Sequence, residues 1–488
     1  MVQPTGKTGS GIPQNFVGFS WETWSVPLMT GKPGQDPSPV KQLVANLSSG
    51  GPINLRIGGN SQDVSWWLPN PSKVPSSFLT DGYVKAELVA NRFPEAKGSM
   101  YFITPNWIGR LASFLQQSGM ETIFGLNLSL GNTANTQQLV NAIIRQVDRQ
   151  NLQAFEIGNE PNLYGRNQRS GWHKEKGKWV KNKDIRKYLT SNLVADYGRY
   201  IKAMPVLIKN KMIAGPAFAD PSTDWTSISS SFYNKFRSNL GLATQHLYAM
   251  KPKNIEGTRT IPKLMSDPYS INLGARLGKE PSRAHQAGLR FRLDEFNTAC
   301  IGGEKGVSDR FAAAIWAPSA LRSVAKAGVD GVNVHFGYGT AYKPFWVDWK
   351  GKQGLARVAP LYYGLYFFSQ TTGNGSKDLP LSITNPQSGV DVWLTQAWNS
   401  EKKLAMVNRS SKPAQVKLAL PDHPAGNVYR LLAPSPSSES GVSWAGRTFD
   451  QTGKLSGSPI GETVVPQSGI YTVDLPAYSA ALLRVPTY

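Results

Sequence analysis

Eight short apolar runs alternate with amphipathic helical patterns over most of the chain, and this alternation restricts the fold more than any other feature. The runs cover residues 16–22, 53–60, 122–129, 154–160, 212–218, 242–248, 291–296 and 331–337. Helical patterns occupy residues 104–119, 136–149, 184–208 and 309–327. Eight buried strands with helices between them are typical of a closed (β/α)8 barrel, an α/β fold, which we therefore predict.

The pattern changes after about residue 373. Short alternating runs, separated by clusters of Pro, Gly and Ser, predict an antiparallel β-sandwich. These runs cover residues 390–398, 403–407, 416–420, 428–432, 471–475 and 480–485. Residues 360–370 are expected to form the last barrel helix. We predict a barrel domain over residues 14–373 and a β-sandwich domain built from residues 1–13 and 374–488.

The charge balance is strongly basic. The 488 residues include 53 Lys and Arg against 32 Asp and Glu, which gives a formal net charge of +21. Such a field attracts polyanions, and nucleic acid, an anionic membrane surface and an acidic polysaccharide all fit the charge alone. The sequence has no apolar run long enough to predict a membrane span. Its single cysteine, Cys300, excludes an internal disulfide framework.

Two glutamates stand at the ends of apolar runs. Glu160 lies in Ala-Phe-Glu-Ile-Gly-Asn-Glu-Pro, and Glu295 lies in Phe-Arg-Leu-Asp-Glu-Phe-Asn-Thr. We expect them to end the fourth and seventh barrel strands and to face each other across a cleft, since catalytic groups of such barrels gather where strands end. Cleavage of a glycosidic bond with retention needs two carboxyl groups about 5 Å apart, so Glu160 is predicted as acid/base and Glu295 as nucleophile. Asn-Glu-Pro is also a turn that begins a helix, and this alternative stays open.

Four more residues are predicted to support this pair. Asn159 would hydrogen-bond the sugar 2-hydroxyl. Arg56 on the second strand would keep Glu295 ionised by opposing its charge, and Tyr248 would donate a hydrogen bond to the same carboxylate. His246 precedes Tyr248 by two positions and points to the same side of the strand, although a buried histidine without a catalytic role is the alternative.

Four stretches of the sequence carry a family resemblance. They are Leu-Arg-Ile-Gly-Gly-Asn at 55–60, Phe-Glu-Ile-Gly-Asn-Glu-Pro at 155–161, His-Leu-Tyr at 246–248 and His-Phe-Gly-Tyr-Gly at 335–339. With them the chain resembles glycoside hydrolase family 79, the β-glucuronidases and heparanases, in the clan of retaining (β/α)8 glycosidases. The resemblance implies a β-D-glucuronide substrate, with Glu160 as proton donor and Glu295 as nucleophile. We expect no cofactor and no metal, because the five histidines form no His-x-x-x-His or His-x-His set.

The resemblance also implies a pocket for the glucuronate carboxylate. Backbone amides approach an anion closely where no side chain intervenes, which suits glycines. The residues implied there are Gly302, Gly303 and Gly339, with Tyr342 or Tyr338 beside them, and Glu22 and Asn60 are placed among the sugar contacts. Animal heparanases carry a long excised linker after the second strand. Residues 68–99 are shorter, so we expect a single uncut chain.

Lysines gather in two segments that would follow the fourth and sixth strands on the same face. The first contains Lys174, Lys176, Lys178 and Lys181, and the second contains Lys251 and Lys253. We expect them to bind sulfate and carboxylate groups, although a solvated charge run is the alternative for any one lysine. The chain is therefore predicted to be a heparanase-like endo-β-glucuronidase whose substrate is heparan sulfate or a similar acidic polysaccharide.

Two other functions stay open. An exo-acting β-glucuronidase would use the same fold and the same catalytic pair. A non-catalytic polyanion-binding protein would explain the charge, but strand-end glutamates would repel phosphates and no nucleic-acid-binding motif is found, so we expect no nucleic-acid partner. The first residues lack an apolar signal core. Either the protein is cytoplasmic or its export signal has been removed. Because large acidic glycans lie mostly outside cells, we expect the second, a secreted or periplasmic monomer.

Overall fold

The computed structural model describes residues 1–32, 34–73, 101–164, 172–175, 178–181, 192–220, 226–266, 269–372 and 376–487. In these residues eight parallel strands close into a barrel in the order β10, β11, β12, β13, β2, β3, β6, β7. In chain order they are β2 (Val17–Glu22), β3 (Asn54–Gly58), β6 (Glu121–Leu126), β7 (Leu152–Ile157), β10 (Ile213–Phe218), β11 (Leu240–Met250), β12 (Arg290–Ala299) and β13 (Gly331–Phe336). The predicted barrel is confirmed, and each expected run corresponds to one of these strands.

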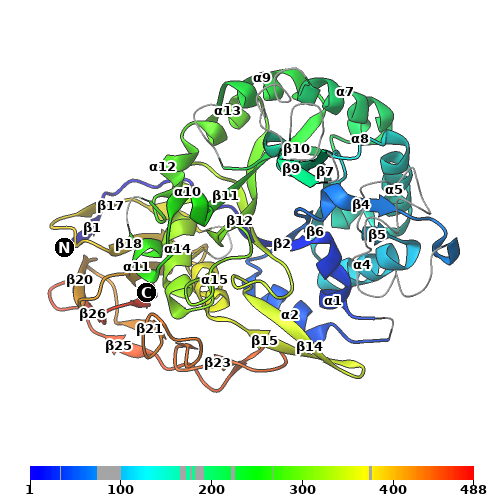
Figure 1. Ribbon diagram of the computed structural model, residues 1–488. Helices are drawn as coiled ribbons and strands as arrows, with labels where there is room; N and C mark the ends of the chain where they lie inside the picture. Colours follow the sequence, from blue (N-terminus) through cyan, green and yellow to red (C-terminus); the bar gives the residue numbers. More distant parts are fainter. Residues whose placement is uncertain are drawn as a thin grey trace.

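Helices surround the barrel as an outer ring (Figure 1). The longer ones are α2 (Ser38–Leu47), α4 (Pro105–Ser118), α5 (Thr133–Gln146), α7 (Val194–Ala203), α9 (Thr226–Phe236), α14 (Phe311–Lys326) and α15 (Pro360–Thr372). The helix expected over 184–208 is divided where it is described, because α7 ends at Ala203 and α8 (Pro205–Lys209) begins at a proline. Proline lacks the N–H that an uninterrupted helix needs and favours a first turn.

The barrel strands are apolar along most of their length because the barrel core covers one face and the helices cover the other. Charged residues are the exception. Arg56 on β3, Glu156 on β7, and Asp294 and Glu295 on β12 are all at most 5% exposed. A buried charge is unfavourable unless it is paired and hydrogen-bonded. These four charged residues therefore indicate a part of the barrel that has a role beyond packing.

The C-terminal part forms two β-sheets beside the barrel, in orange and red in Figure 1. One sheet has the order β17, β1, β20, β26, and the other has the order β16, β18, β19, β27, β21, β22 with β25 beside β21. Their strands are β1 (Val2–Pro4), β16 (Lys377–Leu379), β17 (Leu381–Ile383), β18 (Val390–Gln396), β19 (Lys402–Asn408), β20 (Ala414–Ala419), β21 (Gly426–Leu432), β22 (Ser443–Trp444), β25 (Glu462–Val464), β26 (Ile470–Leu475) and β27 (Ser479–Val485).

The start of the chain belongs to the first of these sheets. Val2 pairs with Ile383 of β17 in the antiparallel sense and with Leu418 of β20 in the parallel sense. Val2 packs in a small core with residues of both sheets, including Leu418 and Leu483. The domain boundaries at residues 13 and 373 stay a prediction.

Several short hairpins were not expected from the sequence. They are β8 (Trp172–Glu175) with β9 (Lys178–Lys181), β14 (Phe345–Lys350) with β15 (Gln353–Val358), and β23 (Thr448–Phe449) with β24 (Leu455–Ser456). A further short pair, β4 (Ser65–Trp67) with β5 (Tyr101–Ile103), is parallel. Across the described ranges, no helix is both long and apolar enough to cross a membrane.

Candidate active site

Glu160 and Glu295 come together beside the barrel strands β11 and β12. One carboxylate oxygen from each glutamate and a ring nitrogen of His246 all lie within 4.8 Å of one another. His246 Nδ1 is 2.9 Å from Glu160 Oε1 and 3.5 Å from Glu295 Oε2. The Glu160 side chain is 19% exposed and that of Glu295 is 6% exposed. One carboxylate is therefore accessible and the other is enclosed.

The backbone places Glu160 differently from the expectation. It does not end a strand, because β7 ends at Ile157 and Glu160 begins the short 3-10 helix Pro161–Leu163. The turn-and-cap alternative thus holds for the backbone even though the side chain meets Glu295. Glu160 has a φ of 48°, a left-handed conformation that is unfavourable for a residue with a side chain. Its N–H donates to the carbonyl of Ala217 at 3.0 Å, which helps to hold the turn.

Asp63 also holds this turn, and sequence reasoning does not identify it. Its Oδ2 accepts from the N–H of Asn159 at 3.1 Å and from the hydroxyl of Tyr164, and its Oδ1 accepts from the N–H of Leu128 at 3.1 Å. Burial raises the pKa of Asp63 to about 6, although these donors oppose the shift. One carboxylate therefore ties together the loops that follow β3, β6 and β7. Its position just after the expected strand 53–60 is the only sequence signal for it.

Glu295 lies inside a strand and not at its end, because β12 continues to Ala299. The register against β13 shifts between Leu293 and Phe296, and that against β11 shifts between Gln245 and His246. An irregularity of this kind re-aims side chains locally. It allows Asp294 and Glu295 to contact the same histidine, although they are neighbours in a strand.

The Glu295 carboxylate accepts hydrogen bonds from two side chains. Arg56 Nη1 donates to Oε1 at 2.6 Å, and the Tyr248 hydroxyl donates to Oε2 at 2.7 Å. Burial alone would raise the pKa of Glu295. The neighbouring His246, His335 and Arg56, together with the Tyr248 hydrogen bond, lower that pKa well below its usual range. The expected support from Arg56 and Tyr248 is thus present as contacts.

Arg56 connects the second strand to the rest of the site. Its Nε and Nη2 donate to Glu156 Oε1 at 3.0 and 2.5 Å, and Nη2 also donates to Asn159 Oδ1 at 3.0 Å. The Asn159 side chain donates in turn to Asn60 Oδ1 at 3.2 Å. Burial opposes the charged form of Arg56, but Glu156 and Glu295 raise its pKa. The guanidinium therefore remains charged and fixes Asn159 beside Glu160.

A second histidine, His335, lies on the opposite side of Glu295. Its Nδ1 is 2.9 Å from Ser20 Oγ and 3.8 Å from Glu295 Oε1, and its Nε2 is 3.6 Å from Glu22 Oε1. Burial opposes protonation, but Glu295 and Glu22 raise the pKa of His335 above its ordinary value. Glu22 is held by the N–H of Ser61 at 3.0 Å. The motif His-Phe-Gly-Tyr-Gly contains His335, yet sequence reasoning gave it no role.

The loops after β12 and β13 bring the residues of the expected carboxylate pocket together. Ala341 N–H donates to Gly302 O at 2.8 Å, so the two loops are joined by a backbone hydrogen bond. The Tyr342 ring stacks on Tyr248 with centroids 6.2 Å apart, and Tyr342 is 3% exposed, whereas Tyr338 is 38% exposed. Tyr342 is therefore the tyrosine joined to the catalytic cluster. The glycines at these positions, Gly302, Gly303 and Gly339, have φ values of 76°, 86° and 90°.

The lysines predicted to bind a polyanion divide into two groups. Lys174, Lys178 and Lys181 lie on the β8–β9 hairpin, whose side chains are outside the described residues, as is Lys176 altogether. Lys251 Nζ is 3.0 Å from Asp220 Oδ2, and Lys253 Nζ is 2.9 Å from Glu304 Oε1. The second segment thus presents lysines whose charge is already matched by carboxylates.

Within the described part of the chain, two overlapping groups of side chains could offer ligands to a metal ion. Glu160, His246 and Glu295 form one group, and Glu156, His246 and Asp294 form the other, each with atoms within 4.8 Å. Arg56 lies 2.6 Å from Glu295 and 2.5 Å from Glu156. Its positive charge, adjacent to both groups, works against a cation at either one.

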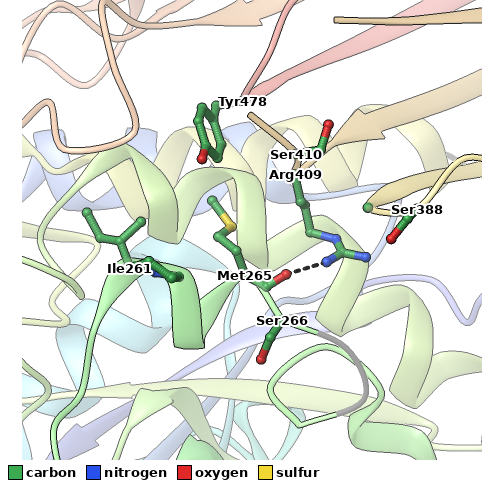
Figure 2. Close-up of a pocket in the computed structure, with 9 residues that line it drawn as sticks. Ile261, Met265, Ser266, Ser388, Arg409, Ser410 and Tyr478 are labelled. Atoms are coloured by element: carbon green, nitrogen blue, oxygen red, sulfur yellow. Dashed lines mark hydrogen bonds between the residues drawn. The ribbon is translucent and has the colours of Figure 1, made fainter. Parts of the chain in front are cut away.

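A cavity of about 320 Å³ lies elsewhere, between the short helix α11 (Ile261–Leu264) and the C-terminal sheets (Figure 2). Figure 2 shows Arg409 reaching from the sandwich side towards Met265, whose carbonyl accepts from Arg409 Nη1 at 2.6 Å. Arg409 Nε also donates to Asp391 Oδ2 at 2.9 Å. Neither Glu160 nor Glu295 lines this cavity, so it is separate from the candidate active site.

Known proteins resemble this chain over its whole length. A curated β-glucuronidase of Aspergillus niger is 22% identical over 516 residues, which cover 96% of this chain and 90% of the relative. A 4-O-α-L-rhamnosyl-β-D-glucuronidase from Fusarium oxysporum shares the fold with a TM-score of 0.75 at 19% identity, over 98% of each chain. A family 51 arabinofuranosidase from Xanthomonas axonopodis pv. citri does so with a TM-score of 0.66 at 14% identity, over 99% of each chain.

A family model matches within the C-terminal sheets. Residues 394–482 match the C-terminal β domain of glycosyl hydrolase family 79. This segment covers most of the strands from β18 to β27, which pack beside the barrel that carries the two glutamates. The C-terminal sheets thus match the β domain of this family, and 96% of the chain is similar to a curated β-glucuronidase.

Proposed function

We propose that this protein is a retaining β-glucuronidase in which Glu160 is the general acid and base and Glu295 is the nucleophile. The observation that carries the proposal is the approach of the two carboxylates to within 4.8 Å of each other. Retaining enzymes hold this pair about 5 Å apart, whereas inverting enzymes need roughly 6.5 Å or more to admit a water molecule between the carboxyl groups.

The two glutamates differ in a way that suits these roles. Glu295 is enclosed, and its low pKa keeps it ionised, so it can attack the anomeric carbon. Glu160 is more exposed and can pass its proton to the leaving glycosidic oxygen. In the second step, the Glu160 carboxylate takes a proton from water, and that water releases the sugar from Glu295. Two inversions at the anomeric carbon retain its configuration.

The glucuronate carboxylate is assigned to the loops that carry Gly302, Gly303 and Tyr342. These loops lie next to Tyr248, which contacts the nucleophile, so an anion bound there would place the sugar ring beside Glu295. The two glucuronidases to which the chain is similar support a glucuronide as the substrate class. Asn159, fixed by Arg56, is assigned to the sugar 2-hydroxyl.

For the polymer specificity, we propose an acidic, glucuronate-containing polysaccharide outside the cell, cut in endo fashion as a heparanase cuts heparan sulfate. The net charge of +21 and the lysines of the β8–β9 hairpin favour such a substrate. The ion pairs of Lys251 and Lys253 favour the second candidate, an exo-acting β-glucuronidase, because they remove one of the two basic segments. Sizing the products formed from a long chain separates the two: fragments indicate endo cleavage, and released monosaccharide indicates exo cleavage.

The catalytic assignment is tested with an electrophilic cyclitol of glucuronate configuration, followed by peptide mapping. The label is expected on Glu295, and a label on another residue would contradict the assignment. A Glu160→Ala variant provides the complementary test. It should retain activity on a glucuronide with a very good leaving group and lose it on a poor one, because only the poor leaving group needs proton donation.

A further inference from the structure

Asp294 is a buried carboxylate beside the catalytic pair, and no described residue donates a hydrogen bond to it. Among the described residues, neither of its carboxylate oxygens has a hydrogen-bond partner, and neither does Nε2 of His246. Both residues are fully buried. Their closest approach joins these same unpartnered atoms, with His246 Nε2 3.5 Å from Asp294 Oδ1. The other ring nitrogen of His246 faces Glu160, so the imidazole lies between Asp294 and the proposed acid.

The requirement for a donor determines which ring nitrogen carries hydrogen. A buried carboxylate without a donor is strongly unfavourable, and a neutral imidazole has one N–H to give. Arg56 is already engaged with Glu156, Glu295 and Asn159. A hydrogen on His246 Nε2 can therefore be donated to Asp294, whereas a hydrogen on Nδ1 cannot. The distance between Nε2 and Asp294 Oδ1 can shorten when substrate orders the site.

We propose that Asp294 is a positioning residue that fixes His246 in the tautomer with hydrogen on Nε2, so that Nδ1 can only accept. Nδ1 is 2.9 Å from Glu160 Oε1, and an acceptor at that distance favours a protonated carboxyl group over an ionised one. Glu160 is thereby kept ready to donate a proton in the free enzyme. The inference rests on the proposed function, in which Glu160 is the acid.

The opposite arrangement makes a different prediction. With hydrogen on Nδ1, or on both nitrogens, His246 would donate to Glu160 and favour its ionised form. Other charged or titratable groups also face this part of the site from the elements packed against it. They are Glu156 on β7, Tyr248 on β11, Glu295 on β12, Arg56 on β3, His335 on β13, and Cys300 after β12. All of them are unchanged by a substitution at Asp294, so a change in the pH profile reports either the histidine tautomer or the lost charge of Asp294, which the two variants below separate.

The tautomer can be observed directly in the unmodified protein. Nitrogen NMR of histidine-labelled enzyme, with His246 assigned by comparison with His246→Gln, distinguishes a hydrogen-bearing ring nitrogen from a lone-pair nitrogen. We expect Nε2 to bear the hydrogen and Nδ1 to bear the lone pair. A hydrogen on Nδ1, alone or together with Nε2, overturns the proposal. This measurement does not depend on whether an Asp294 variant folds.

Kinetics of two matched variants separate the tautomer from the charge. Asp294→Ala removes the acceptor, so the ring hydrogen is free to move to Nδ1 and to favour ionised Glu160. The alkaline limb of kcat/KM should then move to lower pH by about one unit, and the loss of kcat should be about tenfold greater for phenyl than for dinitrophenyl glucuronide. Asp294→Asn should largely restore both, because its carbonyl can accept from Nε2–H while its amide donates to Glu156 Oε2, which is unpartnered within the described residues.

The outcomes distinguish failure of this inference from failure of the proposed function. If Glu160→Ala shows no dependence on the leaving group, Glu160 is not the acid and the proposed function fails. If Glu160→Ala behaves as an acid variant while Asp294→Ala leaves the alkaline limb in place or moves it to higher pH, only the tautomer assignment fails. Equal losses in Asp294→Ala and Asp294→Asn would mean that the charge matters, and would also overturn the assignment.

Discussion

The guanidinium of Arg56 donates directly to the carboxylate of Glu295, with Nη1 2.6 Å from Oε1. The same side chain also pairs with Glu156, so one buried cation supports two buried carboxylates. The contact joins β3 to β12, which are not neighbours in the barrel. The ionisation of the proposed nucleophile therefore depends on a residue from a strand with which its own strand does not pair.

Substitution of Arg56 by Met is expected to move the acidic limb of kcat/KM to higher pH by about one unit or more. Activity falls as the pH drops through the pKa of Glu295, which is held low in part by Arg56, so loss of that charge raises the pKa and moves the limb upward. Two buried carboxylates also lose their partner, which should cost about 3–5 kcal/mol of stability. The measurement is a pH–rate profile at a temperature where circular dichroism shows the variant to be folded. An unmoved acidic limb would contradict this role.

Substitution of Tyr248 by Phe is expected to lower kcat with little change in folding. The variant keeps the ring that stacks on Tyr342 but loses the hydroxyl that donates to Glu295 at 2.7 Å. Stability should fall by only about 1 kcal/mol, the usual value of one hydrogen bond, while the acidic limb moves in the same direction as in the Arg56 variant. Thermal unfolding and kcat/KM against pH test this together. A large loss of stability with an unchanged pH profile would indicate a structural role only.

Two glycines offer a matched test of the carboxylate pocket. Gly303 and Gly306 have similar φ values of 86° and 81°, so alanine strains the backbone equally at both. A Cβ at Gly303 would lie 2.9 Å from Tyr342 N, whereas one at Gly306 meets nothing within 4 Å. Gly303→Ala should raise KM for an aryl glucuronide by about tenfold or more, and Gly306→Ala should not. Equal effects in both variants would contradict the placement of the pocket.

The proposed polyanion substrate predicts a salt dependence. KM for heparan sulfate should rise with ionic strength, and a Lys178→Ala, Lys181→Ala variant should show a shallower slope of log KM against log salt concentration. Lys253→Ala should change the slope less, because Lys253 is already paired with Glu304. A small aryl glucuronide provides the control substrate. A KM for heparan sulfate that is indifferent to salt would count against a polyanionic substrate.

The buried arginine of the sandwich predicts a difference in stability between two arginine variants. The Arg409 side chain is 2% exposed and bonds to Met265 and Asp391, whereas Arg430 forms an ion pair with Glu462, whose side chain is 50% exposed. Arg409→Ala should lower the free energy of unfolding by about 1–3 kcal/mol. Arg430→Ala should lower it by no more than about 1 kcal/mol. Chemical denaturation measures both, and equal losses would show that the Arg409 contacts add little.

The sequence predicts the barrel well because each of its strands is enclosed on both faces and therefore reads as an apolar run. It also singles out the two glutamates that come together in the structure, since each stands near the end of an expected run. It places Glu160 at a strand end, however, whereas a turn through Gly158, with a φ of 82°, separates it from β7. That turn is fixed by contacts with Asp63 and Ala217, which are remote in sequence and leave no local pattern.

The residues that sequence reasoning missed also act through contacts with residues remote in sequence. Asp63 acts through Tyr164 and the backbone of Leu128, and His335 acts through Ser20 and Glu22. Each contact joins residues from different barrel units, so it exists only once those units have packed together. The β14–β15 hairpin was missed for a different reason. Its strands interrupt the expected alternation of strand and helix between β13 and α15.

The pairing of Val2–Pro4 with Leu381–Ile383 sets an order of events during synthesis. Val2–Pro4 has no partner in β17 until almost four hundred further residues have been added, which takes roughly 20 to 80 s at ordinary translation rates. The barrel that lies between them can close in the meantime. β1 must therefore remain unpaired while those residues are made, and its pairing with the later-made sheet would be among the last steps by which the newborn chain reaches its final shape.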